Sequence, residues 1–226
     1  MYRSNVVHPI IVIPVYNGRG SVLKLLDQIK KVTQHTIMII DDGSTDGLDP
    51  SMLPGVVYLK HQSNRGKGAA LKTAFNECQR LGYSHALTLD ADGQHAPELI
   101  QSFIARSLDS PEALVVGARD LITSKMPLHR RLSNNITSQI MSLKTGFQIR
   151  DVQVGYRCYP LSDSRLWLSI EDGFQFEADI FFNVRKLKIK LIWQPIPVIY
   201  GTEDSHMHLV LDTLRFVRTF FRSFKC

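Results

Sequence analysis

The chain has 226 residues, of which 44% are hydrophobic, and it carries a formal net charge of +6 at pH 7. These values are typical of a packed globular protein and exclude an intrinsically disordered chain. The positive charge suits nucleic acid, anionic lipid or phosphorylated substrates, and charge alone does not choose among them.

Features of the whole chain narrow its location. No apolar run approaches the roughly 18 to 20 residues that cross a bilayer, and residues 1–8 lack the basic-then-apolar pattern of a signal peptide. Cys78, Cys158 and Cys226 are widely spaced and odd in number, which predicts free thiols. We expect a cytoplasmic protein.

The first half of the chain alternates two kinds of segment. β-branched and apolar runs predict strands at residues 6–15, 36–40, 55–60, 84–89 and 113–117. Apolar residues at helical spacing predict helices at residues 21–32 and 66–81, and a third helix that begins near Pro97. This alternation favours an α/β fold whose central sheet is mostly parallel, with helices on both faces.

The second half is less regular. A helix is predicted from the spacing of Leu128, Leu132, Ile136, Ile140 and Leu143. Another helix is predicted at residues 174–187, followed by short strands at 189–193 and 196–200. There is no internal repeat or convincing linker, which favours one domain.

Two carboxylates, Asp90 and Asp92, follow the predicted strand at 84–89. Side chains two residues apart on a strand share a face, so this pair could hold Mg²⁺ or Mn²⁺ and leave coordination sites for phosphate oxygens. An acidic turn is the plain alternative. A calcium-binding EF-hand loop is excluded, because it needs Gly at its sixth position and Glu at its twelfth, where this chain has His95 and Gln101.

Polar residues also follow two other predicted strands. Pro14, Tyr16 and Asn17 come at the end of the first strand, and Asp41 and Asp42 at the end of the second. In open sheets of this type, ligands bind at the carboxyl ends of the strands. These residues and the Asp90 motif should therefore converge on one edge of the sheet.

A glycine-rich stretch at residues 64–71 contains Arg65 and Lys67 and invites a phosphate-loop interpretation. Its spacing fits neither the Walker motif nor the dinucleotide-binding pattern. A helix entry that glycine permits, with solvated basic residues, is the alternative.

Taken in order, residues 13–17, 41–46, 64–68 and 90–95 resemble the family-2 glycosyltransferases, and most of all the branch that makes dolichyl- and polyprenyl-phosphate sugars. Later segments are also similar, at residues 116–119, 127–131, 151–157, 176–179 and 205–206. The resemblance spans roughly residues 8 to 210. It implies a GT-A fold, a nucleotide-sugar donor linked to UDP or GDP, and an inverting transfer that depends on Mg²⁺ or Mn²⁺.

The resemblance also implies roles for single residues in the donor site. The residues expected near the nucleotide are Pro14, Tyr16, Asn17, Asp41, Asp42, Arg65 and Lys67, with Asp42 on the base or ribose. Asp90 would face the donor sugar or ribose. Asp92, helped by Gln94 and with Asp90 beside it, would coordinate the metal on the diphosphate.

The acceptor is left open between two chemistries. A lipid phosphate is already an anion and needs no strong base, so cationic side chains could hold it through charge-assisted bonds. The residues expected there are Arg119, Arg130, Arg131, Arg157 and His206. A hydroxyl of a glycan or glycolipid would instead need a carboxylate to take its proton, which makes Glu177 or Asp179 the candidate base.

One segment departs from the pattern of the polyprenyl-phosphate synthases. Those enzymes tend to carry a basic residue just before the late motif, whereas residues 200–206 offer Glu203, Asp204 and His206. His206 could contact the diphosphate or be an ordinary surface histidine.

The C-terminal segment predicts a membrane contact. Its apolar residues form a helical stripe, while Arg215, Arg218, Arg222 and Lys225 gather on a neighbouring face. A basic amphipathic helix with aromatics on its apolar side suits an anionic membrane interface, although a terminal helix docked on the domain is the alternative. We therefore divide the chain into a catalytic domain at residues 1–206 and a helix at 207–226.

The leading hypothesis is a transferase acting on a membrane lipid, most of all a polyprenyl phosphate, at the inner face of the cytoplasmic membrane. A nucleotide-sugar-binding protein without transfer activity is the alternative outside enzymes. Binding of nucleic acid is disfavoured, because the basic residues are scattered and no recognised nucleic-acid motif is present.

Overall fold

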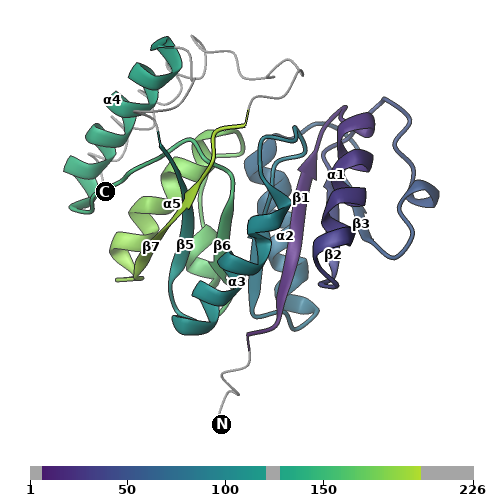
Figure 1. The fold of residues 1–226 in the computed structure, drawn as a ribbon, viewed down its shortest axis with the longest axis horizontal. Coiled ribbons are helices and arrows are strands. Elements are labelled where there is room, and N and C mark those ends of the chain that lie inside the picture. The colour runs from purple at the N-terminus through teal and green to yellow at the C-terminus, as the bar shows by residue number, and fades with distance from the viewer. Residues whose placement is uncertain (1–6, 121–127, 200–226) are drawn as a thin grey trace.

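The computed structural model describes residues 7–120 and 128–199 (Figure 1). Within them, seven strands form one sheet in the order β3-β2-β1-β4-β6-β5-β7. The strands are β1 (Pro9–Val15), β2 (Ile37–Asp41), β3 (Val57–Lys60), β4 (His85–Thr88), β5 (Leu114–Arg119), β6 (Arg157–Pro160) and β7 (Leu191–Ile196). Neighbouring strands are parallel except where β6 pairs with β4 and β5. The mostly parallel sheet predicted from the sequence is confirmed.

Helices cover both faces of this sheet. They are α1 (Arg19–Val32), α2 (Lys67–Arg80), α3 (Ile100–Asp109), α4 (Leu128–Thr145) and α5 (Gln175–Lys186), with short 3₁₀ turns η1 (Pro50–Met52), η2 (Pro97–Leu99) and η3 (Ser164–Trp167). In Figure 1, α1 and α3 lie on one face, and α2 and α5 pack together on the other. The apolar faces of the helices and the inner strands make one buried core.

The sheet differs from the prediction on one side. Residues 157–160 form β6, which was not predicted, because a four-residue strand with Arg157 at its start and Pro160 at its end has little of a strand's usual composition. The two strands predicted at 189–193 and 196–200 are instead one strand, β7, and no strand occupies residues 197–199. Pro195 is tolerated within β7 because β7 is an edge strand.

α4 buries its polar side. Asn134, Thr137, Ser138, Met141 and Thr145 face the protein. Apolar residues on the other side of this helix are exposed: the exposed fraction is 58% for Leu132, 47% for Ile136 and 85% for Leu143. Figure 1 shows α4 at the end of the molecule that carries α5 and β7. The helix predicted at 207–226 lies outside the described residues.

Candidate active site

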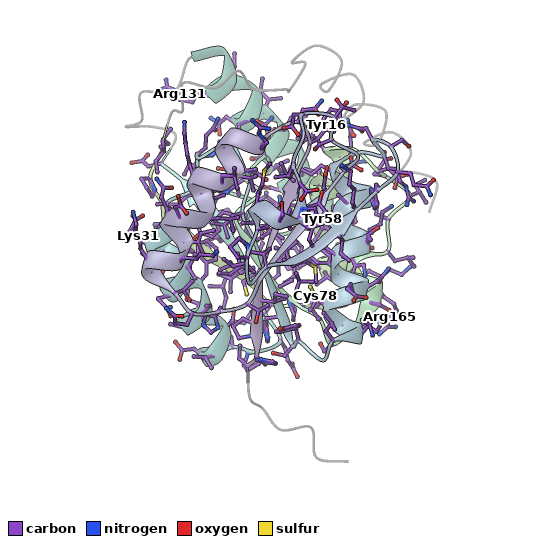
Figure 2. All side chains as sticks on the ribbon, turned by 90° about the vertical axis from the view of Figure 1, so that its right-hand side faces the viewer. Tyr16, Lys31, Tyr58, Cys78, Arg131 and Arg165 are labelled. Atoms are coloured by element: carbon purple, nitrogen blue, oxygen red, sulfur yellow. The ribbon has the colours of Figure 1, made fainter. Side chains whose placement is uncertain are left out.

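The polar loops after β1 and β2 meet at the carboxyl edge of the sheet, as predicted. The backbone N–H of Asn17 donates to the Ser44 hydroxyl at 2.9 Å, and the N–H of Thr45 donates to Asn17 Oδ1, also at 2.9 Å. Asn17 has a φ of 50°, in the left-handed region that Asn tolerates better than most residues. Pro14 is half-buried within β1, and Tyr16 is exposed at this edge (Figure 2).

Asp41 is fully buried and holds the loop that follows β2. Its carboxylate accepts hydrogen bonds from the Tyr58 hydroxyl at 2.6 Å and the Ser44 N–H at 2.7 Å, and Lys60 Nζ lies 3.2 Å away. Burial opposes ionisation, but these hydrogen bonds hold the pKa of Asp41 below its usual value. Asp41 therefore supports the loop after β2, and its predicted contact with the donor stays a prediction.

Asp42 joins β2 to the glycine-rich segment. Its Oδ1 accepts the N–H of Arg65 at 3.0 Å and lies 2.6 Å from His61 Nδ1, and its Oδ2 accepts the N–H of Gly66 at 2.7 Å. Asp42 thereby fixes the backbone that carries Arg65. Contacts of Arg65 and Asp42 with a nucleotide stay predictions.

The glycines of residues 64–71 serve packing. A Cβ on Gly68 would lie 2.6 Å from Phe176 Cβ and 2.9 Å from the Gly173 carbonyl oxygen. The N–H of Ala69 donates to the Asp172 carbonyl at 3.1 Å, so a backbone donor at the start of α2 already has a protein partner. The helix entry is confirmed and brings α2 against α5, but Lys67 is not solvated as that interpretation expected.

Lys67 points inward and joins two carboxylates. Its Nζ lies 2.6 Å from Asp90 Oδ1 and 3.1 Å from each carboxylate oxygen of Glu177. Burial would lower the pKa of Lys67, yet the two carboxylates raise it above its usual value. Lys67 is therefore a cation held inside the protein. Its predicted contact with the nucleotide stays a prediction.

The pKa values of Glu177 and Asp90 are shifted in opposite directions. Burial raises the pKa of Glu177, whose side chain is almost completely enclosed. Burial acts on Asp90 in the same direction, but Lys67 and His95 hold the pKa of Asp90 below its usual value. Asp90 is thus the ionised carboxylate that reaches the edge of the sheet, with 24% of its side chain exposed.

His95 and Gly155 also contact Asp90. The backbone N–H of Asp90 donates to His95 Nδ1 at 3.0 Å, and burial lowers the pKa of His95 to about 4, so its ring is neutral near pH 7. A Cβ on Gly155 would lie 2.5 Å from Asp90 Oδ2. The Thr88 hydroxyl donates to the Gly155 carbonyl at 2.6 Å and fixes that backbone.

Asp92 and Gln94 stand beside this cluster. Both are half-buried, and the N–H of Gln94 donates to Asp92 Oδ1 at 3.0 Å. No group of three His, Cys, Asp or Glu side chains gathers in a metal-binding arrangement among residues 7–120 and 128–199. Carboxylate and amide oxygens nevertheless suit Mg²⁺ or Mn²⁺, which commonly take one or two protein carboxylates and complete their coordination with phosphate and water. The donor set fits such an ion.

The predicted acceptor residues do not form one group. Arg119 makes a two-point ion pair with the buried Asp151, at 2.6 Å from Nε and 2.9 Å from Nη2. Asp151 also accepts from Asn134 Nδ2 at 3.0 Å, which ties the end of β5 to α4. Arg131 lies at the same end of the molecule as Tyr16 (Figure 2). His206 and the side chain of Arg130 lie outside the described residues.

Arg157 belongs to the interior. Its guanidinium is fully buried and donates to the carbonyls of Val154, Glu177 and Val152, at 2.8, 2.6 and 2.9 Å. A guanidinium that three backbone carbonyls hold is not available to an acceptor. The acceptor-binding prediction for Arg157 is therefore replaced by a structural role.

The two candidate bases lie in different surroundings. Glu177 faces Lys67, whereas Asp179, two residues further along α5, accepts a hydrogen bond of 2.5 Å from the Ser169 hydroxyl. Two residues along a helix turn about 200°, so the two side chains point to different sides. The structure does not bring Asp179 to Asp90 and Asp92.

Sequence reasoning missed the roles of Asp151, Gly155 and His95. All three fall inside segments that carry the family resemblance. His95 contacts the backbone of Asp90 five residues away, whereas Asp151 pairs with Arg119 and Gly155 lies against Asp90, both distant in the chain. Spacing along one segment carries no signal for such pairs. The signal that the sequence does contain is composition. An aspartate or a glycine between apolar residues is unusual in a buried segment, so its presence there indicates a specific structural role.

Comparison with known proteins gives matches over most of the chain. A model described as "Glycosyl transferase family 2" matches residues 10–162. The chain is 30% identical over 210 residues to polyprenol monophosphomannose synthase of Mycolicibacterium smegmatis, covering 80% of this chain and 79% of that protein. It is 28% identical over 218 residues to the UDP-N-acetylglucosamine--dolichyl-phosphate N-acetylglucosaminyltransferase of Methanococcus voltae, covering 86% of each.

Solved structures confirm the fold. Glucosyl-3-phosphoglycerate synthase from Mycobacterium tuberculosis, in complex with Mn²⁺, UDP and phosphoglyceric acid, matches with a TM-score of 0.73. The match covers 95% of this chain and 77% of that chain at 14% identity. The GT-A fold that the sequence resemblance implied is therefore present.

Proposed function

The chain belongs to glycosyl transferase family 2, and from that membership we propose that it moves a sugar from a nucleotide-sugar donor to a polyprenyl phosphate, with inversion at the anomeric carbon. Two relatives that match over more than three quarters of this chain carry polyprenol or dolichyl phosphate in their names. The donor nucleotide is UDP or GDP. UDP is named for the Methanococcus voltae relative and is bound in the M. tuberculosis structure.

The observation that carries this proposal is the placement of two acids at the carboxyl edge of the sheet, directly after β4. Lys67 holds Asp90 through one oxygen, whereas Asp92 stands beside Gln94 with oxygen ligands suited to a divalent cation. Mg²⁺ or Mn²⁺ bound there supplies a positive charge that stabilises the departing diphosphate. Asp92 is the proposed principal ligand, with Gln94 and Asp90 beside it.

The transfer needs no strong base when the acceptor is a phosphate. One anionic oxygen of the acceptor attacks the anomeric carbon and forms a new carbon–oxygen bond. The bond from that carbon to the nucleoside diphosphate breaks, and its electron pair leaves with the diphosphate. Neither candidate base faces the two acids with a free carboxylate, since Glu177 is paired with Lys67 and Asp179 lies elsewhere. This arrangement favours the phosphate acceptor over a hydroxyl.

Cationic groups at the same edge would receive the acceptor. Arg119 is held by Asp151 at the end of β5 and keeps 19% of its side chain exposed. Arg131 follows on α4, and Arg130 and His206, whose side chains lie outside the described residues, are proposed to join it. A planar guanidinium binds phosphate oxygens through two parallel hydrogen bonds, which suits a phosphomonoester.

Contact with an anionic membrane is part of the proposal. Leu132, Ile136 and Leu143 present an exposed apolar stripe on α4. The sequence of residues 121–150 contains five Lys and Arg and no Asp or Glu, and this positive charge suits anionic lipid. None of the helices in the described part has the length and apolarity needed to cross a bilayer. We place the protein at the inner face of the cytoplasmic membrane, with residues 207–226 as a second contact.

The test is an acceptor panel with the full chain. Purified protein is incubated with UDP- and GDP-linked sugars, Mn²⁺ and one of four acceptors: polyprenyl phosphate, polyprenol, diacylglycerol or a soluble glycan. The expected result is a glycolipid formed from polyprenyl phosphate alone. Transfer to a hydroxyl acceptor instead would overturn the acceptor assignment. Nucleotide-sugar binding without transfer to any acceptor would support the non-enzyme alternative.

A further inference from the structure

We propose that Glu177 is a positioning residue: its carboxylate is the counter-charge for Lys67, whose ammonium group holds Asp90 in one orientation. The inference rests on the proposed function, since it concerns the acid that faces the donor. It assigns a new role to a residue that the sequence offered as a general base.

The geometry joins three separate elements through one cation. Glu177 lies in the first turn of α5, Lys67 begins α2, and Asp90 follows β4. Both Glu177 oxygens are 3.1 Å from Lys67 Nζ, and Asp90 Oδ1 is 2.6 Å from it on the other side. The exposed fraction of the side chain rises from 6% at Glu177 to 13% at Lys67 and 24% at Asp90. Asp90 is the most exposed member of this series.

Electrostatics explains why the cluster needs Glu177. An ammonium group removed from water loses its hydration, and a single partner at the surface would compensate for only part of that loss. A second carboxylate on the buried side supplies the rest and keeps Lys67 charged. Lys67 can then bind Asp90 Oδ1 firmly, as charge-assisted hydrogen bonds are short and strong.

The Gly155 backbone lies against the Asp90 carboxylate, close to both of its oxygens. The space next to Asp90 Oδ2 is too small for a methyl group on residue 155, because a Cβ there would be 2.5 Å from that oxygen. Asp90 is therefore confined between Lys67 and the Gly155 backbone. A supporting shell of this kind preorganises a group before its ligand arrives.

The same contacts are incompatible with a general base. A base must reach the acceptor hydroxyl directly or through one water. Glu177 Oε2 accepts a hydrogen bond from Lys67, Oε1 is buried 3.1 Å from the same Nζ without a hydrogen bond, and the backbone carbonyl accepts a hydrogen bond from Arg157 at 2.6 Å. Backbone and side chain are thus both fixed in the interior.

Three variants test the inference: Glu177→Gln, Lys67→Met and the double variant, with Glu112→Gln as the matched charge control on an exposed loop residue. The glutamine can still accept a hydrogen bond from Lys67. We expect kcat for Glu177→Gln to fall about 10- to 100-fold, as is usual for supporting residues, with a smaller change in donor KM. Glu112→Gln should match the wild type.

Chemical denaturation of the ligand-free protein supplies a readout that does not depend on activity. Lys67→Met leaves two carboxylates without their shared cation, so adding Glu177→Gln should recover part of the lost stability. If the double variant is no more stable than Lys67→Met, the counter-charge role is wrong. If Glu177→Gln abolishes transfer while its stability and its nucleotide affinity stay unchanged, Glu177 is a base and the inference is overturned.

Gly155→Ala tests the contact between the Gly155 backbone and the Asp90 carboxylate. The residue has no left-handed φ, so alanine adds only the methyl group that collides with Asp90. We expect kcat to fall at least about tenfold in a folded protein. Unchanged kcat would show that the orientation of Asp90 does not matter. If the wild type transfers no sugar at all, the proposed function fails, while the denaturation experiment still decides the role of Glu177.

Discussion

Arg157 shows how a charged side chain can serve the fold. Its guanidinium ties together the loop before β6 and the first turn of α5 through the Val152, Val154 and Glu177 carbonyls. Arg157→Met would leave these buried carbonyls without donors. We expect a loss of about 3 kcal/mol or more in the free energy of unfolding, measured by urea denaturation.

Arg165 is the matched control for this measurement. It lies in η3, and its ion pair with Asp163 is at the surface, with 71% of the Arg165 side chain exposed. Arg165→Met should therefore cost less than about 1 kcal/mol. Equal losses for the two variants would contradict a structural role specific to Arg157.

His85 predicts a pH dependence of stability. Burial in β4 lowers its pKa, and its ring lies 2.9 Å from the Pro111 carbonyl and 2.9 Å from the Ser84 hydroxyl. As pH falls through about 6.5, His85 becomes protonated in the unfolded chain but stays neutral in the folded protein, because its pKa there is lower. The unfolded state is thereby favoured, so the free energy of unfolding decreases. Above that pH the contribution is fully present.

The measurement is urea denaturation of the wild type and His85→Gln between pH 5 and 8. The variant should show a shallower loss of stability on the acid side, because one group that must be neutral in the folded state has been removed. Identical slopes for the two proteins would rule out His85 as a source of the pH dependence.

The sequence located the acidic residues of the site, but it did not show which of them face inward. Asp90 and Asp92 were placed correctly at the end of a strand, because strand ends can be found from apolar runs and acid pairs. Whether Lys67 faces solvent or Glu177 depends on packing between α2 and α5, which lie 110 positions apart at this contact. Local pattern carries no such distance information.

Substitution of two helix glycines by alanine should change the stability in opposite directions. Gly68 lies where α2 meets α5, and an added methyl group would collide with the backbone of Gly173 and with Phe176. Gly20, near the start of α1, has nothing within 4 Å of such a methyl group. Gly68→Ala should destabilise the protein by about 1 to 3 kcal/mol, whereas Gly20→Ala should stabilise it by about 0.4 to 1 kcal/mol. Thermal or urea unfolding checks both, and a stabilising Gly68→Ala would contradict the close packing of α2 on α5.

The two sides of α4 predict different phenotypes. Leu132→Ser combined with Leu143→Ser removes exposed apolar groups, so it should leave the stability unchanged and weaken binding to phosphatidylglycerol-containing vesicles at least about tenfold. Met141→Ala removes a buried group on the other side and should cost about 2 to 5 kcal/mol. Co-sedimentation and urea denaturation measure the two effects.

Leu108→Ser is the control for the vesicle experiment. Leu108 is an equally exposed apolar residue on α3, outside the stripe on α4. It should bind vesicles as the wild type does. Unchanged binding of the α4 double variant would show that α4 does not contact the membrane.

Prediction of the elements was best where chain neighbours are also neighbours in space. The strands and helices of the first half follow the βα alternation, and their core faces could be identified from periodicity. β6 is different, because its antiparallel place between β4 and β5 comes from pairing with distant strands. The exposure of the apolar side of α4 could not be predicted from the sequence either, because periodicity identifies an apolar face of a helix but not whether another element covers it.

At the scale of the whole molecule, the fold brings three loop segments and one ion cluster to a single edge of the sheet. The loops after β1, β2 and β4 come from the parallel part, and the insertion of β6 brings Gly155 and Arg157 under Asp90. The buried thiols of Cys78 and Cys158 are free, as predicted, and burial raises the pKa of each to about 12. They therefore belong to the core and not to the site.

The most direct test of the central claim is to observe the bond that the protein forms. Polyprenyl phosphate is incubated with a nucleotide sugar, Mn²⁺ and either the wild type or Asp92→Asn, and the lipid phosphorus is followed by ³¹P NMR. With the wild type, the phosphomonoester signal should be replaced by that of a sugar phosphodiester, and with Asp92→Asn the monoester should persist. A monoester signal that the wild type leaves unchanged with every nucleotide sugar, or equal conversion by Asp92→Asn, would contradict the proposed transfer at this site.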